Sequence, residues 1–167
     1  MPFDLNDPQQ QAVRADAYEL AFDEAGRALD AQERTVNELR SRASVLVAAA
    51  AVATSFFGGR VLTGDTPRAS SWIAIAAFGV IGVTVLTVLW PRHDWEFSAN
   101  ARDLITEYVE PENVALTLIH RDLAIHRANS HAKNARQLGA LFFAFRIGLV
   151  CLVVEVIAWV VALNGEA

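Results

Sequence analysis

FRIGLVCLVVEVIAWVVAL, residues 145–163, is apolar enough to cross a lipid bilayer, yet it contains Arg146 and Glu155. A spanning helix needs roughly 17 to 25 apolar residues to cross about 30 Å of hydrocarbon. Together with the apolar residues before it, this run covers residues 138–163 and is the longest of three candidate spans. The meaning of the two charges depends on where the bilayer begins.

Two further runs predict membrane spans. ASVLVAAAAVATSFFGG, residues 43–59, is short and rich in alanine. WIAIAAFGVIGVTVLTVLW, residues 72–90, is uncharged and has tryptophan at both ends, where an amphipathic ring prefers the headgroup level. Pro91 follows and ends that helix. The intervening residues 60–71 are rich in Gly, Pro, Thr and Ser, which indicates a short outer loop.

The basic residues predict the orientation in the membrane. The loop of residues 60–71 contains two, Arg60 and Arg68. The segments expected on the opposite side contain eleven, and the ten nearest to the spans are Arg27, Arg34, Arg40, Arg42, Arg92, Arg102, Arg121, Arg127, Lys133 and Arg136. The positive-inside rule therefore places the N-terminus and residues 91–137 in the cytoplasm and the C-terminus outside. The N-terminus lacks the pattern of a cleavable signal peptide, so we expect the apolar runs to belong to the mature protein and to cross the membrane several times.

The cytoplasmic segments carry a heptad pattern typical of paired helices. Its first seam has spacings of three and four and runs into the first span; its members are Ala15, Tyr18, Phe22, Ala25, Leu29, Gln32, Val36, Leu39, Ala43 and Leu46. A second seam runs into the third span through Val114, Leu118, Arg121, Ile125, Ala128, Ala132, Ala135 and Gly139. We therefore expect one long helix over about residues 11–57 and another from near Pro111 to near Leu163. Ser98 is a candidate N-cap for a short helix over residues 98–110.

These patterns predict an all-α fold, an integral membrane helical bundle of three transmembrane helices. Two of them continue as long helices into a cytoplasmic helical stalk, an amphipathic helix over residues 11–42 and the segment of residues 91–137. The whole chain of 167 residues, 53% of them hydrophobic, is then a single membrane module. Three spans make a thin bundle, so we expect a homo-oligomer in contact with membrane lipid. The net charge of −5 argues against nucleic-acid binding.

Arg146 has two interpretations. It lies roughly 12 Å along the helix beyond Leu138. A hydrocarbon region that begins near Arg146 leaves residues 147–163 as the span and lets the arginine reach the cytoplasmic headgroups. Lys133 and Arg136 would then complete a basic collar suited to anionic lipid. In the alternative, Arg146 faces a water-filled path.

Glu155 then lies close to the centre of the span. It cannot pair with Arg146 within one helix, because nine residues at about 100° each place the two side chains on opposite faces. One interpretation is a protonated acid that bonds to a hydroxyl of another span, and Thr54, Ser55 and Thr84 lie at comparable depth. The other is a pore-lining or proton-sensing role, since ionisable groups within spans are functional candidates.

Five basic side chains could converge on the cytoplasmic side, and these are Arg92, His93, Arg102, Arg121 and Arg127. Such a cluster would bind a small anion or nucleotide; the alternative is contact with lipid headgroups. The sequence has no glycine-rich phosphate loop, nucleophile elbow or HExxH helix, so we expect no catalytic residues and no cofactor. His120, His126 and His131 are six and five residues apart, whereas zinc-binding helices use three or four, so we predict no metal site.

LDAQERTVNELRSRASVLVAAAAVATSFFGG, residues 29–59, is an amphipathic helix that ends in arginine and small residues and runs into the membrane. Over residues 1 to about 90 the chain resembles the SLATT-type and PycTM-type membrane effectors of bacterial conflict and antiviral defence systems. The resemblance implies an oligomer that perturbs the inner membrane when a cyclic nucleotide or related signal arrives. The third, charged span departs from that plan. The alternative is a structural or scaffolding membrane protein that recruits a cytoplasmic partner through its helical seam.

Overall fold

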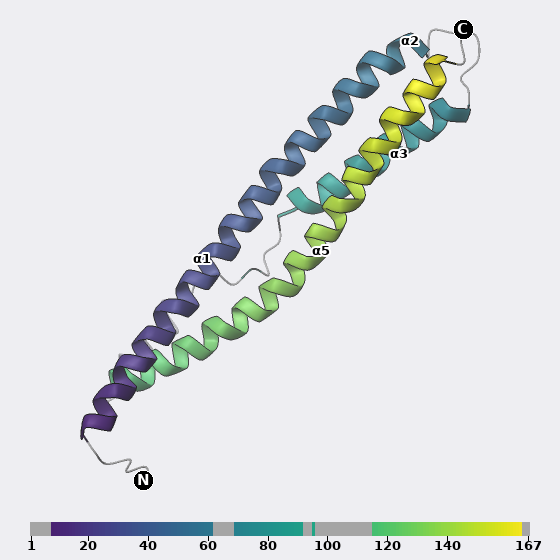
Figure 1. Cartoon of the computed structure of the whole chain (residues 1–167). Coiled ribbons are helices and arrows are strands. Elements are labelled where there is room, and N and C mark those ends of the chain that lie inside the picture. The colour runs from purple at the N-terminus through teal and green to yellow at the C-terminus, as the bar shows by residue number, and fades with distance from the viewer. Residues whose placement is uncertain (1–7, 62–68, 92–94, 96–114, 165–167) are drawn as a thin grey trace. The chain divides into compact units, whose positions relative to one another are not determined.

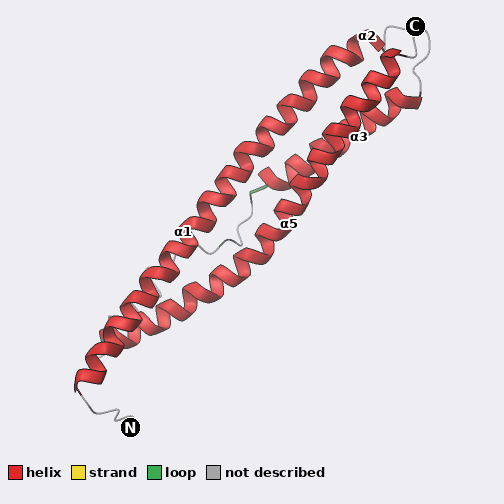
Figure 2. Ribbon diagram, in the orientation of Figure 1, coloured by secondary structure: helices red, strands yellow, loops and turns green. Residues whose placement is uncertain are grey.

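The described part of the chain is almost entirely helical. A computed structural model describes residues 8–61, 69–91, 95 and 115–164, and every element within them is a helix (Figure 2). Helix α1 covers Pro8–Ala53 and is followed by a π-helical turn, Thr54–Gly58, and by the short α2, Gly59–Val61. Helix α3 covers Ala69–Leu89 and α5 covers Leu116–Asn164 (Figure 1). All three long helices are long and apolar enough to cross a membrane, as predicted.

The length of the two longest helices has a simple cause in the sequence. Proline is well suited to the first turn of a helix, and Pro8 is the first residue of α1. From there to Ala53 the sequence contains no further proline and a single glycine, Gly26. Helix α5 likewise contains no proline. The two predicted long helices are therefore confirmed in type, although α1 ends at Ala53, before the π-helical turn. The predicted start near Pro111 and the predicted helix of residues 98–110 lie outside the described residues.

The chain divides into two compact units. Unit 1 consists of Met1–Thr35 and His93–Gln137, and unit 2 consists of Val36–Arg92 and Leu138–Ala167. Helices α1 and α5 each contribute their first part to unit 1 and their second part to unit 2, whereas α3 belongs to unit 2 alone. Helices α1 and α5 therefore each contribute residues to both units.

The heptad seam predicted for α1 is its buried face. The last six predicted positions are each at most 7% exposed, and Ala50 continues the series; they are Leu29, Gln32, Val36, Leu39, Ala43 and Leu46. The first four predicted positions, Ala15, Tyr18, Phe22 and Ala25, are half-buried. A seam that mixes leucine and valine with alanine and glutamine lets a neighbouring helix approach closely along its whole length.

The seam predicted for α5 is not buried within this chain. Leu118 and Ile125 are 50% and 48% exposed, and the remaining described members of that seam are exposed as well. The buried positions lie two residues further on and recur every seven residues: Asn134, Leu141, Gly148, Glu155 and Ala162. Two residues rotate a helix by about 200°, so the buried face is the opposite one. The apolar stripe of α5 therefore faces outward in unit 1, whereas its buried face there is polar.

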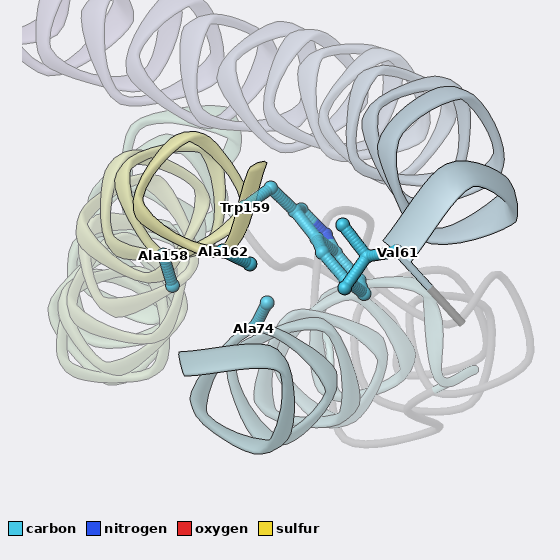
Figure 3. Packing of buried hydrophobic residues seen from close by; sticks show 5 residues of the cluster. All are labelled: Val61, Ala74, Ala158, Trp159 and Ala162. Atoms are coloured by element: carbon cyan, nitrogen blue, oxygen red, sulfur yellow. The ribbon is translucent and has the colours of Figure 1, made fainter. Parts of the chain in front are cut away.

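The core of unit 2 is built around Trp159, which is fully buried on α5. It packs with Val61, Ala74, Ala158 and Ala162. In Figure 3 the indole ring points from α5 toward Val61, while Ala74 of α3 faces Ala162. Gly58, buried at the end of the π-helical turn, makes room for this ring, because a Cβ atom there would lie 3.2 Å from the indole.

Gly148 marks a second point of close approach in unit 2. A Cβ atom at this position would lie 2.8 Å from both Leu46 Cδ2 of α1 and Thr84 Oγ1 of α3. Both distances are shorter than real Cβ contacts allow, so only glycine fits without movement of the neighbours. The three helices of unit 2 therefore meet at Gly148, one heptad before Glu155.

Candidate functional site

Glu155 is the most unusual side chain of unit 2. It lies on α5, it is 0% exposed, and it occupies the same heptad position as Leu141 and Ala162. The hydroxyl of Thr54 donates a hydrogen bond of 2.5 Å to Glu155 Oε1. The acid is therefore a core residue that joins α5 to the end of α1, and of the two interpretations of Glu155 this geometry favours the bond to a hydroxyl of another span.

The partner of Glu155 sits on an irregular turn. Thr54 begins the π-helical segment Thr54–Gly58, which separates α1 from α2. Such turns are rare and are found frequently at functional sites, because they rotate the residues that follow them relative to a regular helix. Thr54 at the start of this turn contacts Glu155, and Gly58 at its end contacts Trp159. The first and last residues of the turn, four residues apart, thus contact two residues of α5 that are also four residues apart.

The second carboxyl oxygen of Glu155, Oε2, is buried and forms no hydrogen bond of normal geometry with a described residue. The same is true of Trp159 Nε1, one helical turn further on. Ser71 Oγ on α3 and Arg40 Nε on α1 are the other buried groups of unit 2 in this condition among the described residues. Buried polar atoms normally have a partner, and Trp159 does interact with the Glu155 carboxyl group, so the indole and the Thr54 hydroxyl together hold the acid.

The other predicted hydroxyl partners do not reach Glu155. Ser55 is exposed. The Thr84 hydroxyl donates to the Ile81 carbonyl oxygen of its own helix over 2.9 Å and lies against Gly148. Arg146 is exposed, whereas Glu155 is buried, so the two charges of the third candidate span face different surroundings.

The predicted anion cluster is only partly described, since Arg92, His93 and Arg102 lie outside the described residues. Arg121 is exposed and forms an ion pair of 3.4 Å with Asp122. Arg127 instead contacts Phe22. Its guanidinium lies over the Phe22 ring at 3.8 Å, and its Nη1 donates to the Phe22 carbonyl oxygen over 3.1 Å.

Several contact residues were missed by the sequence analysis. In unit 1 the Phe22 ring also stacks on His120, at 5.4 Å between ring centres. Gly26 leaves room for Arg127, because a Cβ atom there would lie 2.7 Å from Arg127 Nη1. The seven-residue spacing between His120 and Arg127 is a signal that could have indicated this contact, had polar residues been allowed on the seam. No group of three or more potential metal ligands occurs within the described ranges.

No family model matches the chain, and no curated protein or solved structure is significantly similar to it.

Proposed function

We propose that the chain is a non-enzymatic, homo-oligomeric protein of a bacterial inner membrane. In this arrangement α3 and the unit 2 parts of α1 and α5 cross the bilayer, and unit 1 lies in the cytoplasm. The outward faces of unit 2 support the proposal, since they carry large apolar side chains such as Val83, Leu86 and Val150, which are 60% exposed or more. Exposed apolar surface of this kind needs lipid. Trp72 and Trp90, both exposed at the ends of α3, suit the two interfaces.

The proposed activity is a perturbation of the membrane under the control of a cytoplasmic signal. The observation that carries it is the burial of Glu155. An acidic residue at the centre of a spanning helix costs about 2.5 to 3.5 kcal/mol on insertion scales. An apolar residue would avoid that cost, so a functional role accounts for Glu155 better than stability does.

We infer a closed state in which Thr54 holds Glu155 between α1 and α5. Opening separates the two helices in unit 2 and presents the carboxyl group to a polar path formed by several copies. Helices α1 and α5 also pair in unit 1, through Phe22 and Arg127, so a small anionic ligand or cyclic nucleotide that alters this pairing would act on the same two helices. The resemblance to membrane effectors supports this form of control.

The test is the membrane potential of cells that express the protein, read with a potential-sensitive dye. Thr54→Val removes the donor, so it favours the open state and increases depolarisation above that of the wild type. Glu155→Leu removes the polar group itself and abolishes depolarisation. Thr87→Val is the matched control, because Thr87 is exposed and its hydroxyl bonds only to the Val83 carbonyl oxygen of its own helix. An unchanged potential for the wild type and for Thr54→Val at equal membrane abundance would refute the proposal.

A second function is favoured by one observation. The apolar stripe of α5 in unit 1 is exposed, with Leu118 and Ile125 seven residues apart on one face. A scaffolding protein would use such a stripe to recruit a cytoplasmic partner or a second copy. This alternative predicts that vesicles containing the protein stay sealed for all variants. It also predicts that Leu118→Asp with Ile125→Asp abolishes a stoichiometric complex.

A further inference from the structure

A groove on unit 2 runs between α1 and α5. It has a volume of about 400 Å³, and its walls are Val45, Leu46 and Ala49 of α1 with Phe145, Leu149 and Leu152 of α5. Its polar lining consists of Ser41 and Arg42, which lie at the end of the groove nearest the start of unit 2 on α1. The groove therefore has one polar end and an apolar floor.

The groove continues along α1. A second hollow shares Val45 and Ala49 with it and extends to Phe56 and Phe57. From Arg42 to Phe56 the helix rises about 21 Å. One leaflet of the hydrocarbon core is about 15 Å deep, so the combined hollow is long enough to hold an acyl chain through a leaflet.

The charges around the polar end favour an anion. Arg42 has a side chain that is 63% exposed, and the exposed Arg146 directly follows Phe145 of the groove wall. Glu38, which pairs with Arg42 one turn away, is the acidic group on that side. Glu155 is the other acid among the described residues of unit 2, and it is fully buried. A negatively charged headgroup would therefore meet the Arg42 guanidinium and the Ser41 hydroxyl at the polar end.

We propose that this groove binds one anionic glycerophospholipid, with its phosphate at Arg42 and Ser41 and one acyl chain along Val45, Ala49, Leu149 and Leu152. The positive-inside bias places this end of α1 at the cytoplasmic leaflet. A second copy fits the groove less well, because a two-fold pairing along α1 would bring Arg42 of one copy against Arg42 of the other. The proposal rests on the proposed insertion of unit 2 into the bilayer and does not depend on membrane perturbation.

The test uses the full chain, purified in mild detergent and exposed to phosphatidylglycerol or phosphatidylcholine with identical acyl chains. Native mass spectrometry counts the lipids bound to each protein molecule. We expect the wild type to bind the first phosphatidylglycerol about fivefold more tightly than phosphatidylcholine, the preference that one arginine near the headgroup supplies. Arg42→Gln abolishes the preference and leaves phosphatidylcholine binding unchanged. Arg60→Gln, a change of the same charge on α2, keeps the preference.

A second variant tests the apolar part of the groove. Ala49 is exposed, so Ala49→Phe fills the hollow without a change in the buried seam, and it reduces the binding of both lipids at least fivefold. Leu149→Trp serves as an independent filling variant. Equal affinity of the wild type for the two lipids would overturn the proposal. A change in oligomeric state with Ala49→Phe, at unaltered lipid binding, would also overturn it, because the groove would then hold a second copy. Recovery of the protein in the membrane fraction tests insertion separately.

Discussion

The hydrogen bond between Thr54 and Glu155 predicts a specific pattern of stabilities in a double-mutant cycle. Thr54→Val is nearly isosteric, so it leaves no cavity and removes only the donor to Glu155 Oε1. A buried acceptor that loses its partner costs about 1 to 3 kcal/mol, while bonds between spanning helices average about 0.6 kcal/mol and reach about 1.7 kcal/mol. Because Thr54 is half-buried and Glu155 fully buried, we expect a loss of about 1 kcal/mol.

Glu155→Leu should differ from Thr54→Val in its effect on stability, because it removes both carboxyl oxygens and leaves no unsatisfied acceptor. We expect it to be neutral or stabilising, and Thr54→Val in that background to have no further effect. The coupling energy of the cycle is then about 1 kcal/mol. Reversible unfolding in mixed micelles can be followed by labelling Cys151, the single cysteine, which is half-buried on α5. A coupling energy below about 0.3 kcal/mol would refute the assignment, since distant sites already add to within that margin.

Three further variants test the packing of the helices. Gly148→Leu places a Cβ atom against two neighbouring side chains and should destabilise unit 2 by about 1 to 3 kcal/mol. Gly79→Leu is the control, because a Cβ atom there meets nothing within 4 Å. Equal effects of the two variants in the unfolding assay would contradict the close approach at Gly148. Trp159→Ala should reduce the stability of unit 2 by about 2 kcal/mol, because it leaves a cavity in the core. The transfer free energy of the lost indole contributes little, since lipid is as apolar as the core. An unchanged stability would contradict the placement of Trp159 in the core. Gly26→Leu should displace Arg127 and cost about 1 kcal/mol, an effect that should vanish in an Arg127→Ala background when proteolysis of unit 1 is measured.

The sequence predicts α1 well, because its helix is long and its buried face is marked by a continuous period of apolar and small residues. Leu29, Val36 and Leu39 alone define the face, and the structure buries all three. The three apolar helices follow from length and composition, which need no knowledge of neighbours.

The register of α5 could not be predicted in the same way, because apolar periodicity identifies a buried face only where that face is apolar. In unit 1 the buried positions of α5 include Ser130 and Asn134, while Leu118 and Ile125 face outward. Both faces repeat every seven residues, so the period was correct and the phase was not. In unit 2 the same series reads Leu141, then glycine, then an acid, and two of these three residues are not typical of a core.

The sequence predicts three possible hydroxyl partners for Glu155 but does not decide among them. Thr54, Ser55 and Thr84 lie at comparable depth in their spans, so depth alone does not identify the partner. The partner is the residue whose side chain lies on the helix face toward Glu155. Thr54 and Ser55 are adjacent, so only the rotation of the last turns of α1 separates them, and a π-helical turn changes that rotation. Trp159 shares a face with Glu155 one turn away, a spacing visible in the sequence, but its burial depends on Gly58, a residue far away in the chain.

The pairing of α1 with α5 has a consequence for biosynthesis. Thr54 and Glu155 are separated by 101 residues, which a ribosome at 5 to 20 residues per second adds in about 5 to 20 s. In the proposed membrane arrangement, α1 and α3 are therefore released toward the bilayer while the buried face of α1 is still unpaired. The acid enters last, when its hydroxyl partner is already in place. Completion of the third helix is thus the step that commits a nascent chain to its final structure, and a chain that ends before residue 155 would remain a two-helix hairpin open to proteolysis.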